Sequence, residues 1–290
     1  GKGSSLSPLA EKLVWADRRI SARLSPMLDS LASELQAEID RVLTSVPPLL
    51  RIHASHGFAV ETLHHALGAA GVVTELRYCG SVEAVASLHA GTCELAGFHL
   101  PVGEFEAAAV EHYAPWLKPA SQRLIGIATR RLGLMVAQGD PKKVYGIRDL
   151  ARPDVRFINR QSGSGTRFLL DLMLHKEGIA PARVHGYEQC ELTHAAVAAY
   201  VASDMADVGF GVETPARRFK LDFVPVVTER YFLLGEERTL ELPAVRATLG
   251  VIQGAAFKDA VNRLPGYQAD DTTGVVSGLR QTLPTLRAAR

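Results

Sequence analysis

A dense group of hydrogen-bond donors lies in the stretch NRQSGSGTRFLLDLML, residues 159–174. Ser162, Ser164, Thr166 and Arg167 fall within six residues, and no acid stands among them. The preceding DVRFINR favours a strand and the following residues favour a helix, so the order is strand, small-residue turn, helix. Amides at a helix start carry partial positive charge, and glycine lets the backbone approach a bound oxyanion. The stretch therefore predicts an anion site; the alternative is a tight turn in which Ser164 or Thr166 only caps a helix that begins near Arg167.

The stretch does not match known phosphate loops or nucleophile motifs. It does not end in Gly-Lys-Ser/Thr, its glycines lack dinucleotide-fingerprint spacing, and its serine lacks the spacing of a hydrolase elbow. Tyr187, Glu188, Thr193 and His194 lie at a further helix start, and Glu188, Glu191 and His194 are conceivable acid–base partners. Acids at a helix start are, however, typical of dipole stabilisation. We therefore expect no enzymatic activity and no cofactor.

The spacing of histidine and cysteine does not indicate a metal site. His64 and His65 are adjacent, which points them to different parts of a helix surface, and the other histidines have no ligand-type spacing. Cys79, Cys93 and Cys190 are odd in number and form no CxxC pair, which indicates neither a disulfide framework nor a zinc site.

Composition bounds the class of protein. The chain has 290 residues, 47% of them hydrophobic, and a formal net charge of +1. This length suffices for two compact lobes, and the charge argues against a large nucleic-acid surface within these residues. Arg18, Arg19 and Arg23 are typical of the solvated face of a helix. Without an apolar run of bilayer length or a secretion signal, we expect no membrane association and a cytoplasmic location.

The first part of the sequence predicts a long amphipathic helix from Ser7 to Leu43. Ser7 is a suitable cap, Pro8 suits the first turn, and apolar residues recur in steps of three and four. Pro26 is expected to kink this helix or to restart it with Ser25 as cap. A single apolar stripe of this length predicts a partner helix, from the same chain or from a second copy.

After the paired prolines of TSVPPLL, strands alternate with helices. LLRIHAS, VVTELRYCG and TCELAGFHLP are expected as strands, separated by the helices GFAVETLHHALGAAG, closed by Gly71, and SVEAVASLHAG. RLGLMVAQG, KVYGIRDLA, DVRFINR, ELTHAAVAAYVASDMA and ADVGFGVE continue as strand, short helix, strand, helix and strand, and LDFVPVVTERYFLL as strand or crossover. This rhythm predicts an α/β protein with a parallel sheet covered on both faces.

Two chain crossings, near Leu132 and Pro225, divide the series into two lobes on the plan of a periplasmic-binding-protein (type II) fold. Lobe I is expected at about residues 49–132 and 226–290, and lobe II at about 133–225. In such a fold the ligand occupies the cleft between the lobes, at helix starts that follow strand ends. The candidate ligand-binding residues lie in three turns of this kind and are Ser55, His56, Ser81, Ser162, Ser164, Gly165, Thr166 and Arg167.

Three segments carry a family resemblance. FINRQSGSGTRFLLD, SVEAVASLHAGTCELAGFHLP, and ADVGFGVE with VPVVTERYFL resemble the PBP-like domain related to molybdate- and tungstate-binding proteins, over roughly residues 50–235. That family is attached to winged-helix regulators and to molybdopterin biosynthesis proteins, which implies sensing of an oxyanion or small anion. The resemblance carries Ser55, Ser164, Thr166 and Arg167 forward as anion-site residues.

The beginning of the chain carries a second resemblance. GKGSSLSPLAEKLVWADRR resembles the end of the wing and the start of the linker helix in LysR-type transcriptional regulators and in the molybdate-responsive regulator family, although Ala10 stands where those families commonly have glycine. The resemblance implies that residues 1–48 form the wing end and a linker and dimerisation helix. It also implies DNA-reading helices before Gly1, promoter DNA as a partner, and a homo-oligomer, either dimer or tetramer.

The sequence therefore predicts the effector-sensing domain of a LysR-like DNA-binding regulator. Molybdate or tungstate is the favoured ligand, and sulfate, phosphate or a small carboxylate such as formate is the competitor, because Arg167 and Arg160 suit a carboxylate as well. Two alternatives stay open: a solute-binding protein of an oxyanion ABC transporter, and a PBP-like domain of a molybdopterin biosynthesis protein.

Overall fold

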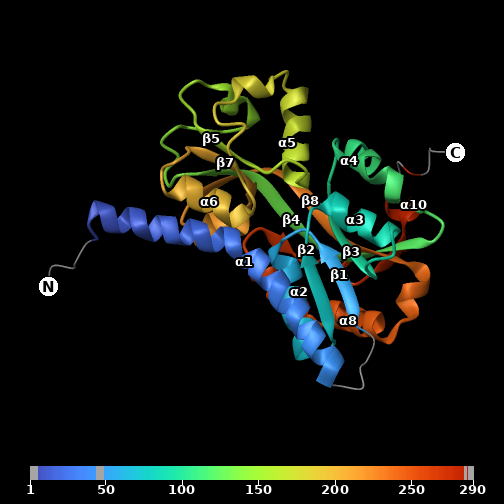
Figure 1. Ribbon diagram of the computed structural model, residues 1–290. Coiled ribbons are helices and arrows are strands. Elements are labelled where there is room, and N and C mark those ends of the chain that lie inside the picture. The colour runs from blue at the N-terminus through green and yellow to red at the C-terminus, as the bar shows by residue number, and fades with distance from the viewer. Residues whose placement is uncertain (1–5, 44–48, 284–285, 287–290) are drawn as a thin grey trace. The chain divides into compact units, whose positions relative to one another are not determined.

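The computed structural model describes residues 6–43, 49–283 and 286 (Figure 1). Residues 1–5 and 44–48, which belong to the segment expected to form the wing end and the linker helix, therefore lie outside the described part. The α-helices are α1 (Pro8–Leu43), α2 (Phe58–Ala69), α3 (Ser81–His89), α4 (Glu106–Tyr113), α5 (Gly165–Lys176), α6 (His194–Ala202), α7 (Glu213–Arg218), α8 (Pro243–Gln253), α9 (Ala255–Asn262) and α10 (Leu279–Thr282). The strands are β1 (Leu50–Ala54), β2 (Thr74–Tyr78), β3 (Leu95–Pro101), β4 (Gln122–Val136), β5 (Phe157–Arg160), β6 (Cys190–Glu191), β7 (Val208–Val212), β8 (Asp222–Glu236), β9 (Tyr267–Gln268) and β10 (Val276–Gly278).

The chain forms two compact units, and the strands β4 and β8 contribute residues to both. The first unit comprises residues up to Met27, Leu132–Ser162 and Thr166–Val226. The second unit comprises Leu28–Arg131, Gly163–Gly165 and the residues from Val227 onward. The α/β class and the PBP-like type II fold are as predicted, with α1 preceding the domain.

The second unit is built on a mixed sheet. β1 pairs in parallel with β2 on one side and with β3 on the other, and β3 pairs antiparallel with β8. Because β1–α2–β2 and β2–α3–β3 move in opposite directions across this sheet, right-handed crossovers place α2 and α3 on opposite faces (Figure 1). Helices α8 and α9 pack with α2, and the short strands β9 and β10 pair antiparallel with β4.

The first unit has a smaller sheet. β7 pairs antiparallel with the end of β4 and in parallel with β5, which in turn pairs with β6. The alanine-rich helix α6 packs closely on this sheet, so Val197 and Ala198 join Met135 and Ile158 in a fully buried core. Gly209 permits this approach, because a Cβ at that position would lie 2.4 Å from a methyl carbon of Val197.

Helix α1 is continuous from Pro8 to Leu43. Its start is as predicted, since Ser7 Oγ accepts a hydrogen bond from the amide of Ala10 (3.2 Å). The expected restart at Ser25 is wrong: the Ser25 hydroxyl donates to the carbonyl of Ser21 inside the helix (2.9 Å), and Pro26 stands in the helix interior.

Side chains of the first unit contact the N-terminal part of α1, up to Met27. The guanidinium of Arg23 donates to both carboxylate oxygens of Glu191, whose side chain is 1% exposed. Thr193 donates to the carbonyl of Ala22 (2.9 Å), and the guanidinium of Arg19 lies over the ring of Tyr200 (5.8 Å). The expectation that these arginines form only a solvated face is therefore wrong, because they join α1 to the β6–α6 region.

In the second unit, two serines of α1 bind the edge of β2. Ser33 Oγ accepts from the amide of Leu76 (2.8 Å) and donates to the carbonyl of Thr74 (3.4 Å). Ser30 Oγ accepts from the amide of Tyr78 (3.0 Å). These hydroxyls satisfy backbone groups of an edge strand that has no further strand beside it in the described sheet.

Most of the expected elements are present with shifted ends. Gly71 follows α2 with a left-handed φ of +73°, as its predicted role at the end of this helix requires. The segment LDFVPVVTERYFLL is a strand, part of β8, whereas KVYGIRDLA supplies only the 3₁₀ turn Ile147–Ala151. Across the described ranges, no helix combines the length and the apolar character that crossing a membrane requires.

Candidate functional site

The carboxyl ends of β1, β2 and β3 meet at one edge of the second unit's sheet. Ala54, the last residue of β1, is in register with Tyr78 on one side and with Gly97 on the other. Two expected turns, Ser55–His56 and Cys79–Ser81, therefore leave the sheet side by side, and the amide of Cys79 donates to the carbonyl of Ala54 (2.9 Å). Each turn leads directly into a helix, so two helix starts lie at this edge.

The side chain of Ser55 is hydrogen-bonded to His99, a residue that the sequence did not indicate as part of a site. Ser55 Oγ lies 3.2 Å from Nδ1 of His99, which is 8% exposed and stacks on the ring of Tyr231 at 4.2 Å. The Tyr231 hydroxyl fits over Gly97, where a Cβ would lie 2.0 Å from it. This stack places the side chain of Ser55 at the carboxyl edge of β1.

His56 lies among aromatic rings. It is half-buried, and its ring meets Tyr78 edge-on at 5.0 Å and Phe58 at 6.1 Å. Burial raises the pKa of Tyr78, so this phenol stays protonated at neutral pH. The ring of His56 therefore packs against the aromatic side chains on either side of the turn before α2.

Ser81 lies beside the turn Gly163–Ser164–Gly165, called the GSG turn below, and both belong to the second unit. Ser81 is 4% exposed at the first position of α3, and its side chain hydrogen-bonds the hydroxyl of the buried Tyr113. A Cβ on Gly165 would lie 3.8 Å from both hydroxyl oxygens, and a Cβ on Gly80 would lie 3.5 Å from the carbonyl oxygen of Gly163. Two of the three expected turns are thus in contact.

The GSG turn has the conformation that its glycines suggested. Gly163 has a φ of +80°, which disfavours any side chain, and α5 begins at Gly165, two residues before the expected start at Arg167. Ser164 is 7% exposed, whereas Ser162 is exposed. The buried Ser164, rather than Ser162, is therefore positioned beside the start of α5.

Thr166 and Arg167 belong to the first unit. Thr166 is buried, and the Arg167 guanidinium lies over the ring of Tyr187 at 4.5 Å and pairs with Glu188 (3.4 Å). The Tyr187 hydroxyl donates to Asp171 (2.6 Å). The expectation that this loop has no compensating acid is wrong, because Glu188 supplies one from 21 residues away, although that carboxylate is 86% exposed.

Arg130 and Glu229 form a buried ion pair in the second unit, and neither was indicated by the sequence. Nε and Nη2 of Arg130 lie 2.8 Å and 2.7 Å from Oε2 of Glu229, and both side chains are 4% exposed. Although burial alone would lower the pKa of Arg130, the neighbouring carboxylate raises it, so the guanidinium stays charged. The cross-strand neighbour of Arg130 is Tyr267 on β9.

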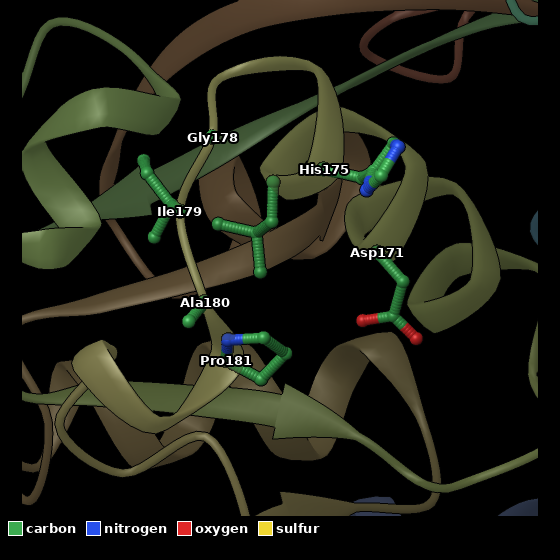
Figure 2. Close-up of a pocket in the computed structure, with 7 residues that line it drawn as sticks. Asp171, His175, Gly178, Ile179, Ala180 and Pro181 are labelled. Atoms are coloured by element: carbon green, nitrogen blue, oxygen red, sulfur yellow. The ribbon is translucent and has the colours of Figure 1, made fainter.

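A separate pocket of about 450 Å³ opens at the end of α5 in the first unit (Figure 2). Its lining is mostly apolar and consists of Asp171, Leu174, His175, Gly178, Ile179, Ala180 and Pro181. Asp171 already accepts a hydrogen bond from Tyr187, and its carboxylate disfavours an anion. The lining of this pocket therefore lacks the serine hydroxyls found at the strand edge.

Histidines and cysteines do not gather into a metal site in the part of the chain that the structure describes. Burial raises the pKa of both Cys79 and Cys93 to about 12, so these thiols stay protonated at neutral pH. Burial also lowers the pKa of His53 and His64.

Residues 62–253 match the family described as the PBP superfamily domain. The chain belongs to this family. The uncharacterized protein YvgK of Bacillus subtilis (strain 168) is 32% identical over 204 residues, which make up 69% of this chain and 64% of that protein. The chain therefore spans less than two thirds of the length of this relative.

Three solved structures of different kinds of protein share the fold of this chain. A substrate-binding protein from Clostridium perfringens with bound phosphate has a TM-score of 0.55 at 13% identity, over 77% of this chain and 100% of that chain. The tungstate ABC transporter structure from Geobacter sulfurreducens has a TM-score of 0.52 at 12% identity, over 74% and 97%. The regulatory domain of MetR, a LysR family regulator from N. meningitidis, has a TM-score of 0.51 at 13% identity, over 76% and 99%. At these identities the likeness shows the fold alone.

Proposed function

We propose that the chain is the effector-binding part of a LysR-like transcription regulator and that its effector is a small oxyanion. The observation that carries the proposal is the strand edge of the second unit, where Ser55 and Ser81 stand at two adjacent helix starts and the GSG turn contacts Ser81. Hydroxyls and helix amides are the donors that an oxyanion needs on several sides. We expect binding rather than catalysis.

Molybdate or tungstate is the favoured ligand of this proposal. The fold is shared with a tungstate transporter structure and with a phosphate-bound protein, which supports an anion without fixing which one. Ser55, Ser81 and Ser164 are the proposed hydroxyl donors, with His56 and Gly165 beside them. Thr166 and Arg167 stay predicted ligands, and Ser162, which is exposed, stays the weakest of the predicted set.

The face of α1 supports the regulatory half of the proposal. Its exposed apolar residues recur along both halves of the helix and are Leu9, Leu13, Val14, Ile20, Leu24, Met27, Leu28, Leu31, Leu35 and Ile39. Such a stripe is complementary to a copy of itself, so we propose that α1 pairs with α1 of a second copy. Promoter DNA would then be bound by segments outside the residues described, and ligand would act by binding one arrangement better than another.

A solute-binding protein of an oxyanion ABC transporter is the second candidate, favoured by the phosphate-bound and tungstate neighbours. The hydrogen bonds of Ser30 and Ser33 to β2 make the part of α1 from Leu28 onward an integral part of the second unit. The exposed stripe of α1 has no evident use in a monomeric solute carrier. Sequencing the native gene upstream of Gly1 separates the candidates, because a regulator requires a helix-turn-helix there and an exported carrier requires a signal peptide.

Isothermal titration of the purified chain with molybdate, tungstate, sulfate, phosphate and formate tests the proposal. We expect tight binding of one anion, weakened at least tenfold by Ser55→Ala, Ser81→Ala and Ser164→Ala, and the same titration of Arg167→Ala decides the role of that arginine. Ser25→Ala is the matched control, because its hydroxyl is exposed and bonded within α1. No heat with any of the five anions, together with unchanged melting temperatures, would refute an oxyanion effector.

A further inference from the structure

An unused donor of Arg130 points to a specific subsite at the start of α2. Nε and Nη2 of this guanidinium are occupied by Glu229, whereas the only other polar side chain that interacts with the guanidinium is the neighbouring Tyr267, and Nη1 makes no further hydrogen bond among the described residues. The side chain is 4% exposed, so water does not reach it freely. A buried guanidinium with one free N–H direction is unusual, because buried donors are nearly always paired.

The second unused donor is the hydroxyl of Tyr267. Its residue is 7% exposed, and its oxygen can accept from the neighbouring Arg130 guanidinium, whereas its own O–H has no acceptor within the described ranges. Tyr267 stands opposite Arg130 in the β4–β9 register, and its ring meets Phe58, the first residue of α2, edge-on at 6.5 Å. The guanidinium and the phenol, neighbours on β4 and β9, therefore keep donor capacity beyond their mutual contact at the same helix start.

Gly57 is the residue on which both donors converge. A Cβ built on Gly57 would lie 3.7 Å from Nη1 of Arg130 and 3.8 Å from the hydroxyl oxygen of Tyr267. Gly57 has φ −166° and ψ 147°, an extended conformation open to any residue, so the backbone does not require glycine here. The missing side chain instead leaves space between the two donors and the start of the 12-residue helix α2.

The helix start adds a third donor group. Gly57 is the N-cap of α2 and makes no side-chain cap, and the first amides of an α-helix have no acceptor within the helix. The carbonyl oxygen of Ser55 would lie 3.9 Å from the same Cβ, so a ligand oxygen that carries a proton also finds an acceptor. The arrangement suits one anionic oxygen held by a guanidinium N–H, a phenol and helix amides.

We propose that Arg130, Tyr267 and the start of α2 at Gly57 bind one oxygen of the anionic effector. This subsite rests on the proposed function and adds to it: the charge of Arg130 is balanced by Glu229, so Arg130 acts as a directed donor rather than as a net positive charge. The shared chemistry of the ligand is an anionic oxygen, supplied either by a tetrahedral oxyanion or by a carboxylate.

Two variants test the subsite without removing the buried ion pair. Gly57→Ala places a methyl group in the proposed oxygen position, at contacts that are ordinary for carbon, and Tyr267→Phe removes the hydroxyl. We expect at least tenfold weaker anion binding for Gly57→Ala and about threefold to tenfold weaker binding for Tyr267→Phe, each with a ligand-free melting temperature close to that of the wild type. Gly68→Ala is the matched control in α2, because its Cβ would meet nothing within 4 Å.

The titration with molybdate, tungstate, sulfate, phosphate and formate separates the outcomes. Weakening by both variants for a tetrahedral anion supports the subsite and the oxyanion, and the same weakening for formate alone supports the subsite with a carboxylate instead. Binding that Ser55→Ala weakens but that Gly57→Ala and Tyr267→Phe leave unchanged overturns the subsite and keeps the proposed function. Absence of binding by any of the five anions overturns both.

Discussion

The hydroxyl of Thr193 donates to the carbonyl of Ala22 at 2.9 Å. In a regular helix this carbonyl would accept from the amide of residue 26, but residue 26 is proline and has no N–H. The same Thr193 oxygen accepts from the amide of Ala196 (2.9 Å) and so caps α6. One hydroxyl thus supplies the donor that Pro26 lacks and begins a second helix, which explains why α1 continues through a proline.

This arrangement predicts coupling between Thr193 and Pro26. Thr193→Val keeps the shape of the side chain and should destabilise the fold by about 1–3 kcal/mol, because it leaves the Ala22 carbonyl and the Ala196 amide without this partner. In a Pro26→Ala background the helix amide returns, so the loss should be smaller by about 1 kcal/mol. Urea unfolding of the two single variants and the double variant measures the difference, and strictly additive free energies would contradict the explanation.

Gly97 is expected to be intolerant of any side chain. A Cβ there would lie 2.0 Å from the Tyr231 hydroxyl and 2.8 Å from the Cβ of Ala54, so Gly97→Ala must displace the ring on which His99 stacks. We expect a destabilisation of about 1–3 kcal/mol, measured by urea unfolding. Gly250→Ala, in α8 with nothing within 4 Å of its Cβ, is the control and should be neutral or stabilise by up to about 1 kcal/mol.

Stability should fall on mild acidification. Burial lowers the pKa of His53 and His64 in the folded chain below the ordinary value of about 6.5. The unfolded chain therefore binds these protons more readily, so the stabilisation is present above about pH 6.5 and is lost as the pH falls through the folded pKa values. Urea midpoints at pH 7.5, 6.5 and 5.5 should decrease in that order. His64→Gln should flatten this dependence, and an unaltered slope in that variant would count against the assignment.

Pairing through α1 should depend on its exposed leucines. Leu31 and Leu35 are 55% and 62% exposed, so replacing both with lysine should leave the fold of the second unit intact while it removes part of the stripe. Sedimentation equilibrium should show an oligomer for the wild type and a shift toward monomer for the double variant. Glu34→Gln, a neighbouring exposed position, is the control; a monomeric wild type would exclude the proposed pairing.

Local patterns predicted the elements that depend on neighbours in the sequence. The turn of Gly163 and the helix that follows it were predictable, because glycine and serine act on the backbone within a few residues. Ser7 as a cap and Gly71 at the end of α2 belong to the same class. The start of α5 was misplaced by two residues, because several small residues in a row offer more than one acceptable helix start.

The buried polar groups of the candidate site were not predictable in the same way. Arg130 and Glu229 are 99 residues apart, so no local period links them, and the same holds outside the site for Arg23 and Glu191, which are 168 residues apart. An isolated arginine in a β pattern gives no indication of whether it faces solvent or a carboxylate from a distant strand. Contacts between distant strands can be assigned only when the sheet register is known. The neighbour relation of Arg130 and Tyr267, for example, follows from the β4–β9 pairing.

The hydroxyls of Ser30 and Ser33 against β2 have a consequence for solubility. An edge strand with free amides and carbonyls is a template on which another chain can add a strand, and growth by such addition leads to aggregates. By occupying the groups of Thr74, Leu76 and Tyr78, α1 closes this edge with side chains rather than with another strand. The helix that we propose as a pairing surface thus also prevents a strand of another chain from adding to β2.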